Sequence, residues 1–169
     1  MIVRPETPSD FEAIDELLTS AFGQADESQL VRLIRASDNY VPDLTLVAEE
    51  NGQVVGHIMF SYITLKNDEE FRVLSLAPMA VTPDRQKSGI GAALVEAGLE
   101  RADDRREPLV NLVGHPTYYP RFGFEPAGRY GIEPPSADFP DDAFMVQRLS
   151  QYSERHRGRV VYPPAFGMT

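Results

Sequence analysis

The chain has 169 residues, the usual size of one globular domain, and 42% of them are hydrophobic, which is enough for a packed core. It contains no cysteine, so disulfides, thiolate metal sites and cysteine nucleophiles are excluded. Acidic residues outnumber basic ones by 26 to 16, a formal net charge of −10. Because phosphate contacts dominate nucleic-acid affinity, this balance argues against DNA or RNA and favours a cationic or neutral partner.

We expect no targeting, membrane-spanning or linking segment in this chain. No apolar run approaches the roughly 20 residues that cross a bilayer, and the first residues turn charged at once. With no cysteine present, we expect a cytoplasmic protein that is not bound to a membrane. No repeat or linker divides the chain, so a single domain over 1–169 is expected, with its core in about 1–130 and a Pro-rich loop and closing strands in 131–169.

Two helices and a strand meander are predicted in the first half. After a short strand at Ile2–Arg4, Ser9 and Asp10 are candidate caps of a helix that reaches Phe22. Then follow a helix at Ser28–Arg35, strands at Leu44–Glu49, Val54–Leu65 and Phe71–Val81, and a hairpin turn over 50–53.

The second half reads as strand, helix and strand. A glycine-containing loop opens a long helix at about Gly89–Asp103, and Leu109–Val113 is a strand covered on both faces. A short helix over Thr117–Phe122 and closing strands at Phe144–Leu149 and Val160–Tyr162 complete the chain. This order predicts an α/β layer sandwich around one mixed sheet.

The loop between Val81 and Leu94 is the strongest candidate for an anion site. It follows a strand and opens a helix, whose first N–H groups lack intrahelical acceptors and lie at the positive end of the helix dipole. Arg85 and Lys87 add positive charge. A P-loop is excluded because no Gly-Lys-Ser/Thr ending exists, and a dinucleotide fingerprint because Leu94 stands where a small residue is required.

The segment Gln86-Lys87-Ser88-Gly89-Ile90-Gly91 resembles the acetyl-CoA signature of the GNAT N-acetyltransferase superfamily, Gln/Arg-x-x-Gly-x-Gly/Ala. The resemblance implies acetyl-CoA as co-substrate, no metal, and a pyrophosphate cradled by the backbone from Gln86 to Ala92. For an isolated match, the alternative is a glycine-rich helix start that serves only tight packing.

The strand before this loop contains a proline, in Leu76-Ala77-Pro78-Met79-Ala80-Val81. Proline removes a ladder donor, so the sheet either opens there or the strand ends early. The segment resembles the splayed fourth strand of the GNAT fold. The resemblance implies a largely antiparallel sheet opened between the fourth and fifth strands, with Met79, Ala80 and Val81 binding pantetheine through their backbone.

A third landmark is Tyr118-Tyr119-Pro120-Arg121-Phe122-Gly123-Phe124, which is similar to the Tyr-x-x-x-Gly-Phe segment of many GNAT members. At that spacing, Tyr119 is implied to be the acid that protonates the leaving thiolate; both tyrosines acting as packing aromatics is the alternative. The three segments align over Phe71 to Phe124 and most resemble a broad bacterial branch of predicted acetyltransferases. The Pro-rich stretch from Glu133 to Pro140 is a surface loop or lines the acceptor side.

The general base is not identified by the sequence. GNAT members often place a carboxylate on the fourth or fifth strand, where this chain has Ser75 and Asn111. His115 is the best-placed titratable residue, although a solvated loop histidine is the commoner role. Asp26 and Glu27 either attract a cationic acceptor or are ordinary acids at a helix start.

The resulting hypothesis is direct transfer of acetyl from acetyl-CoA to an amine of a small molecule or peptide, in a ternary complex. Backbone N–H groups near Met79 to Val81 would stabilise the oxyanion and Tyr119 would protonate the thiolate. The alternative is a non-catalytic acetyl-CoA-binding sensor or regulatory module. The acceptor, the acyl chain length and the choice between monomer and homodimer stay open.

Overall fold

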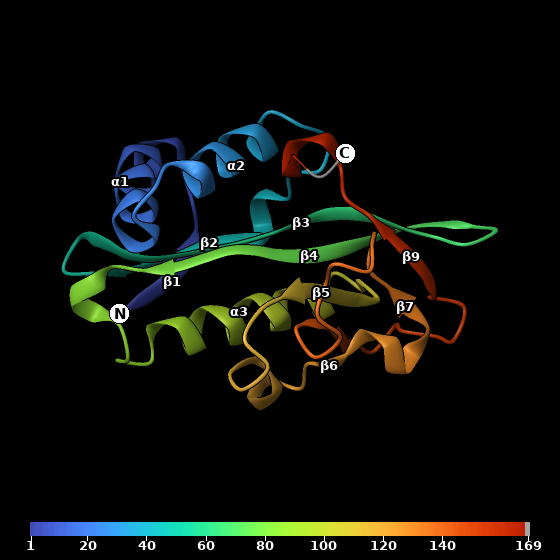
Figure 1. Cartoon of the computed structure of the whole chain (residues 1–169). Coiled ribbons are helices and arrows are strands. Elements are labelled where there is room, and N and C mark those ends of the chain that lie inside the picture. Colours follow the sequence, from blue (N-terminus) through green and yellow to red (C-terminus); the bar gives the residue numbers. More distant parts are fainter. Residues whose placement is uncertain (168–169) are drawn as a thin grey trace. The chain divides into compact units, whose positions relative to one another are not determined.

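The computed structural model describes residues 1–167 (Figure 1). These residues form two compact units. The first unit comprises Met1–Ser61 and Leu76–Arg101. The second comprises Tyr62–Ser75 and the described residues from Ala102 onward. Each unit is therefore assembled from segments that are distant in the sequence. Within residues 1–167, no helix combines the length and the apolar character needed to cross a membrane.

Three α-helices, nine strands and six short 3₁₀ helices make up the regular structure of residues 1–167. The α-helices are α1 (Phe11–Phe22), α2 (Asp26–Arg35) and α3 (Ile90–Asp104). The strands are β1 (Ile2–Pro5), β2 (Thr45–Glu50), β3 (Gln53–Lys66), β4 (Glu70–Val81), β5 (Leu109–Val113), β6 (Glu125–Pro126), β7 (Ile132–Glu133), β8 (Phe144–Arg148) and β9 (Gly158–Val161).

The strands form one mixed sheet. Neighbouring strands follow the order β1-β2-β3-β4-β5-β8-β6, and β9 pairs with β3 and β7. The pairs β1–β2, β2–β3, β5–β8, β6–β8 and β3–β9 are antiparallel, whereas β4–β5 and β7–β9 are parallel. The expected mixed, largely antiparallel sheet with flanking helices is confirmed.

In the first unit, α1 and α2 lie on one face of the strands and α3 on the other (Figure 1). The chain enters α1 through a 3₁₀ turn at Pro8–Asp10. The Asp10 carboxylate accepts the backbone N–H of Thr7 at 2.8 Å, so Asp10 closes a capping box with Thr7 and Ser9 is not the cap. The helix ends at Gly23, whose left-handed φ of 71° lets its N–H reach the Thr19 carbonyl.

Helix α3 packs on β3 through two glycines that leave room for large side chains. A Cβ at Gly56 on β3 would lie 2.9 Å from the side chains of both Ile90 and Leu94 on α3. A Cβ at Gly98 on α3 would lie 2.1 Å from the ring of Phe60 on β3. This reciprocal fit of small against large residues fixes the axis of α3, and hence the position of its first turn.

Strand β4 continues through its proline. Pro78 is buried, the Ala77–Pro78 peptide is cis, and the strand extends to Val81. The alternative that Pro78 ends the strand is therefore wrong. Strand β4 pairs with β5 at Leu74 and Ser75, opposite Val110 and Asn111. This short parallel pairing fits a sheet that opens between the fourth and fifth strands.

The second unit has its own hydrophobic core between the strands and the C-terminal segment. Its buried members are Ile63, Leu65, Val73, Leu109, Ala127, Ile132, Phe144, Val146, Val160 and Tyr162. Phe139, from the Pro-rich stretch, packs on this core and stacks on Tyr162 with ring centroids 6.3 Å apart. That stretch is thus anchored by an aromatic side chain.

Candidate active site

The end of β4 leads directly into the predicted coenzyme loop, and both belong to the first unit. Met79 and Val81 are half-buried, whereas Ala80 is buried, as expected for side chains that alternate along a strand. The Thr82 N–H donates to the Val55 carbonyl at 2.9 Å and ties this end of β4 to β3. The Gln86 side-chain amide donates to the Val81 carbonyl at 3.2 Å, which braces the start of the loop.

The loop itself is braced by its own side chains and by the β2–β3 hairpin. Ser88 donates its hydroxyl to the Arg85 carbonyl, and the Arg85 guanidinium forms an ion pair with Glu50 at the end of β2. Glu50 therefore offsets the charge that Arg85 was expected to contribute. Lys87 is exposed and forms no ion pair within residues 1–167, so its ammonium group is available to an anionic ligand.

Two left-handed residues turn the loop into α3. Lys87 has a φ of 64° and Gly89 a φ of 88°. The Ala93 N–H donates to the Gly89 carbonyl at 3.1 Å and begins the helical pattern. The preceding N–H groups of Ile90, Gly91 and Ala92 have no intrahelical acceptor and lie at the positive end of the helix dipole. These donors fit a pyrophosphate, and since the Ile90 side chain is buried, Ile90 can contribute only its backbone.

Tyr119 is held at the end of β5 in the second unit. The backbone N–H groups of Tyr118 and Tyr119 donate to the His115 carbonyl, and a 3₁₀ turn follows at Tyr119–Phe122. The Tyr119 ring lies against Gly114, where a Cβ would come within 2.5 Å of it. On another side the ring meets Phe124 edge to face, with centroids 5.9 Å apart. The ring is therefore fixed by packing.

The hydroxyl of Tyr119 is protonated and unengaged. Tyr119 makes contacts through its ring and its backbone, and no residue within 1–167 forms a hydrogen bond with its hydroxyl. Burial, with a smaller contribution from Tyr118, raises the pKa of Tyr119 to about 12. Such a group is suited to donate a proton near neutral pH and is not suited to accept one.

The side chains considered for the general base differ in whether they already have hydrogen-bond partners. Asn111 is fully buried; its amide N–H₂ donates to the Met145 carbonyl at 3.0 Å and its oxygen accepts the Tyr162 hydroxyl at 3.0 Å. Asn111 is therefore committed to holding β5, β8 and the C-terminal segment together. His115 is exposed, and within the described chain its imidazole has no hydrogen-bond partner. Its backbone carbonyl, in contrast, organises the Tyr119 turn.

Asp26 and Glu27 lie in the first turn of α2, where acids stabilise a helix. Glu27 accepts the side-chain amide of Gln24 at 3.3 Å. Their placement agrees with the role of ordinary helix-start acids. The structure thus brings Met79–Val81 and Gln86–Ala92 together in one unit, and His115 and Tyr119 together in the other.

A buried ionic network in the first unit was missed from the sequence. Glu6 accepts hydrogen bonds from Arg35 at 2.7 and 2.9 Å, from Tyr40 at 2.6 Å, and from the His57 ring at 3.2 Å. The side chains of Glu6 and His57 are fully buried. The one available signal was a histidine in the middle of an apolar strand.

Comparison with known proteins gives a consistent result. The family model described as acetyltransferase (GNAT) domain matches residues 2–127. The uncharacterized N-acetyltransferase YjhQ of Escherichia coli K12 is 40% identical over 129 residues, which are 75% of this chain and 71% of YjhQ.

Two solved structures resemble this chain over 98% of its length. The crystal structure of the GNAT family N-acetyltransferase YhbS of Escherichia coli, in complex with CoA, has a TM-score of 0.89 and 30% identity over 98% of this chain and 91% of YhbS. A GNAT family acetyltransferase from Brucella melitensis, in complex with acetyl-CoA, has a TM-score of 0.79 and 30% identity over 98% of this chain and 97% of that chain.

Proposed function

Because the chain belongs to the GNAT family of acetyltransferases, we propose that it transfers an acetyl group from acetyl-CoA to an amine of a small-molecule or peptide acceptor. The observation that carries the proposal is the set of unengaged N–H donors at the start of α3, reached through Lys87 and Gly89 with left-handed φ. The CoA and acetyl-CoA complexes of the two similar proteins support the same co-substrate for this chain.

In this proposal, the start of α3 and the end of β4 bind different parts of the coenzyme. The N–H groups of Ile90, Gly91 and Ala92 bind the pyrophosphate, and the free ammonium of Lys87 adds a positive charge beside it. The backbone of Met79–Val81 pairs with the amides of pantetheine, as an added strand would. Val81 contributes its N–H, since its carbonyl is already used by Gln86.

The chemistry we propose is direct transfer in a ternary complex. The acceptor nitrogen forms a bond to the thioester carbonyl carbon, and backbone N–H groups at the end of β4 stabilise the negative charge on the carbonyl oxygen. When the C–S bond breaks, Tyr119 donates its proton to the departing sulfur. An acceptor amine with a pKa of about 10.4 must first lose a proton. We propose the exposed His115 imidazole for that step.

The first test is coenzyme binding and turnover with the full chain. Acetyl-CoA should raise the melting temperature, because a ligand that binds only the native state stabilises it by mass action. A panel of amines should then release free CoA. Coenzyme binding without turnover on any amine would favour a non-catalytic acetyl-CoA sensor, and no binding at millimolar coenzyme would contradict both functions.

The same panel of amines also identifies the chemical class of the acceptor. Polyamines, aminoglycosides, amino acids and peptide amino termini cover the small-molecule and peptide classes that the proposal allows. A peptide-specific enzyme should turn over only acceptors with a free amino terminus or lysine. The ranking of kcat/KM across the panel is the measurement that names the class.

A further inference from the structure

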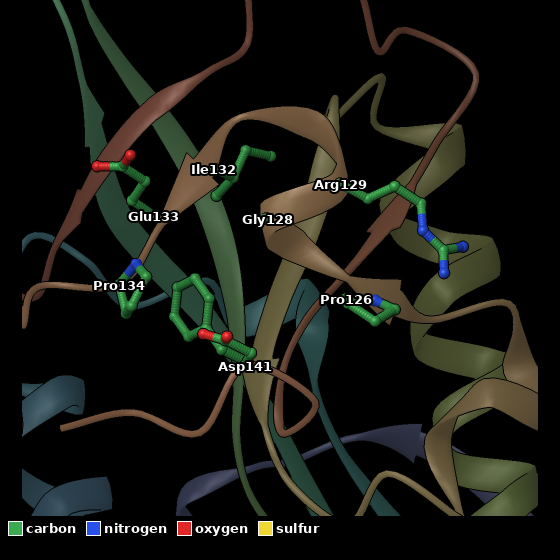
Figure 2. A pocket seen from close by; sticks show the side chains of 8 residues that line it. Pro126, Gly128, Arg129, Ile132, Glu133, Pro134 and Asp141 are labelled. Carbon is green, nitrogen blue, oxygen red and sulfur yellow. The ribbon is translucent and has the colours of Figure 1, made fainter. Parts of the chain in front are cut away.

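The second unit contains a cavity of about 450 Å³ that the proposed chemistry does not use (Figure 2). It is formed by the segment that joins β6 to β8. Its walls are mainly apolar and come from Pro126, Ile132, Pro134 and Phe144. Three charged residues, Arg129, Glu133 and Asp141, lie around it. A cavity of this size, with apolar walls and few charges, is typical of a small-ligand site.

Two of the three charged residues form ion pairs with residues outside the cavity lining, and Glu125, the partner of Arg129, also pairs with Arg148. Arg129 forms an ion pair with Glu125 at 3.0 Å, and Figure 2 shows its side chain directed away from the cavity. Glu133 forms an ion pair with Arg159 at 3.2 Å. Asp141 has no ion pair or hydrogen bond to its carboxylate within residues 1–167. Asp141 is therefore the one charged residue of the cavity lining whose side chain has no partner among residues 1–167.

Asp141 lies in a hydrogen-bonded turn that is connected to the segment holding Tyr119. The N–H groups of Ala143 and Phe144 both donate to the Pro140 carbonyl at 3.1 Å, which closes the turn around Asp141. The Gly114 N–H donates to the Ala143 carbonyl at 3.0 Å. The ring of Tyr119 packs on that same Gly114. These contacts connect the turn that contains Asp141 to the segment that holds the proposed acid.

We infer that this cavity binds the acceptor, and that the acceptor is a diamine-type molecule in which a hydrocarbon segment separates two amino groups. Asp141 holds one amino group as the ammonium ion, and the apolar walls cover the hydrocarbon. An ammonium ion has no lone pair and cannot attack a thioester, so the reacting nitrogen is the second amine of the same molecule. This inference rests on the proposed function and narrows its acceptor class.

The test compares diamines with a monoamine of matched hydrocarbon length. Cadaverine and putrescine carry a second amino group, whereas n-pentylamine does not. The kcat/KM for cadaverine should exceed that for n-pentylamine. Asp141→Asn should lower the cadaverine value about three- to fivefold, the size of a partly exposed ion pair, and leave n-pentylamine unchanged. The matched control is Asp142→Asn, which removes the neighbouring exposed carboxylate and should change neither value.

Direct binding separates this inference from the proposed function. Titration of cadaverine into the coenzyme-free protein, followed by calorimetry or NMR, should show the same three- to fivefold weakening in Asp141→Asn. Equal cadaverine affinity in the Asp141→Asn and Asp142→Asn variants would overturn the inference, even if acetyl transfer to other amines were intact. Asp141-dependent binding with no transfer to any amine would keep the cation site and contradict the transferase.

Discussion

A tyrosine that acts as a proton donor must be protonated and must keep its hydroxyl free for the ligand. Tyr119 meets both conditions: burial raises its pKa to about 12, and its ring, not its hydroxyl, makes the contacts that hold it. The ring of Tyr118 packs against other residues: the guanidinium of Arg121 lies 4.5 Å from its ring centre, and Phe122 meets it edge to face. The two neighbouring tyrosines are therefore separable by mutation.

Tyr119→Phe should lower the single-turnover rate by about 10²- to 10⁴-fold, the usual contribution of general-acid catalysis. It should leave acetyl-CoA affinity unchanged, and the free energy of unfolding within about 0.5 kcal/mol, because no hydrogen bond is lost. Rapid-quench kinetics with a good acceptor measure the rate. Tyr118→Phe is the control, and a loss confined to that control would transfer the role to Tyr118.

Gly91→Val should weaken acetyl-CoA binding at least tenfold, about 1.4 kcal/mol, because a branched side chain at the first turn of α3 obstructs close approach of the pyrophosphate. Gly91 is preferable to Gly89, whose φ of 88° would add backbone strain to any substitution. Isothermal titration gives the affinity. Gly128→Val, at a site where a Cβ meets nothing within 4 Å, is the matched control; equal affinities in the two variants would place the cradle elsewhere.

At the scale of elements, α3 is positioned by contacts that the sequence pattern does not reveal. A glycine inside a helix normally costs about 1 kcal/mol relative to alanine. At Gly98 we expect the balance to reverse, because a Cβ would lie 2.1 Å from the ring of Phe60, which is fully buried. The glycine is retained by packing against β3.

Gly98→Ala should therefore destabilise the fold by about 1–3 kcal/mol, as overpacking does, in place of the gain that helix propensity alone predicts. Because the helix axis must shift, acetyl-CoA affinity should fall as well. Urea unfolding measures the first effect and calorimetry the second. Gly128→Ala should be neutral or slightly stabilising, and a stabilised Gly98→Ala would show that Phe60 can yield.

The sequence could predict the elements whose residues carry a strong local pattern. Strand β5 at Leu109–Val113 was predicted to the residue, and the long helix to within one residue, because each has a strong hydrophobic pattern. The hairpin at Asn51 and Gly52 was predicted from turn chemistry, and both residues have left-handed φ.

The elements that were missed carry no such signal. Strands β6 and β7 contain two residues each, too short for any period to appear. The helix expected over Thr117–Phe122 is a 3₁₀ turn at Tyr119–Phe122, as Pro120 provides no backbone N–H. The sequence could not predict that Asp141 lies beside an apolar cavity without an ion-pair partner. That placement follows from which residues distant in the sequence pack and pair around the cavity, and no local pattern contains that information.

At the scale of the whole molecule, acidic side chains both set the net charge and stabilise the fold. Burial alone would raise the pKa of Glu6, but hydrogen bonds from His57, Arg35 and Tyr40 lower it to about 2. The Arg4 hydrogen bond outweighs burial and lowers the pKa of Asp10 to about 2. Burial lowers the pKa of His57 despite its bond to Glu6, so this ring is neutral and donates from Nε2.

On acidification, these pKa shifts all lower the free energy of unfolding. A carboxylate whose pKa falls from 4.5 to about 2 on folding stabilises the protein above pH 4.5, and that stability is lost as the pH falls towards 2. His57, whose pKa is lowered from 6.5, contributes in the same sense, because the unfolded chain takes up its proton first below pH 6.5. The free energy of unfolding should therefore decline from about pH 6.5 downward, with Glu6 alone accounting for about 3 kcal/mol.

Glu6→Gln should remove the share of Glu6, about 3 kcal/mol, from the decline between pH 4.5 and 2. The share of Asp10 in that range should stay, and so should the part just below pH 6.5, because His57 stays buried. At neutral pH the variant should be less stable by about 3–5 kcal/mol, since Arg35 loses its buried counter-charge. Urea unfolding at a series of pH values measures both effects, with the exposed Glu12→Gln as control. Tyr40→Phe removes one of the hydrogen bonds to Glu6 and should flatten the acid limb partially. If Glu6→Gln kept the wild-type slope between pH 4.5 and 2, the acid lability would have to arise from other carboxylates, with Asp10 the first to examine by Asp10→Asn.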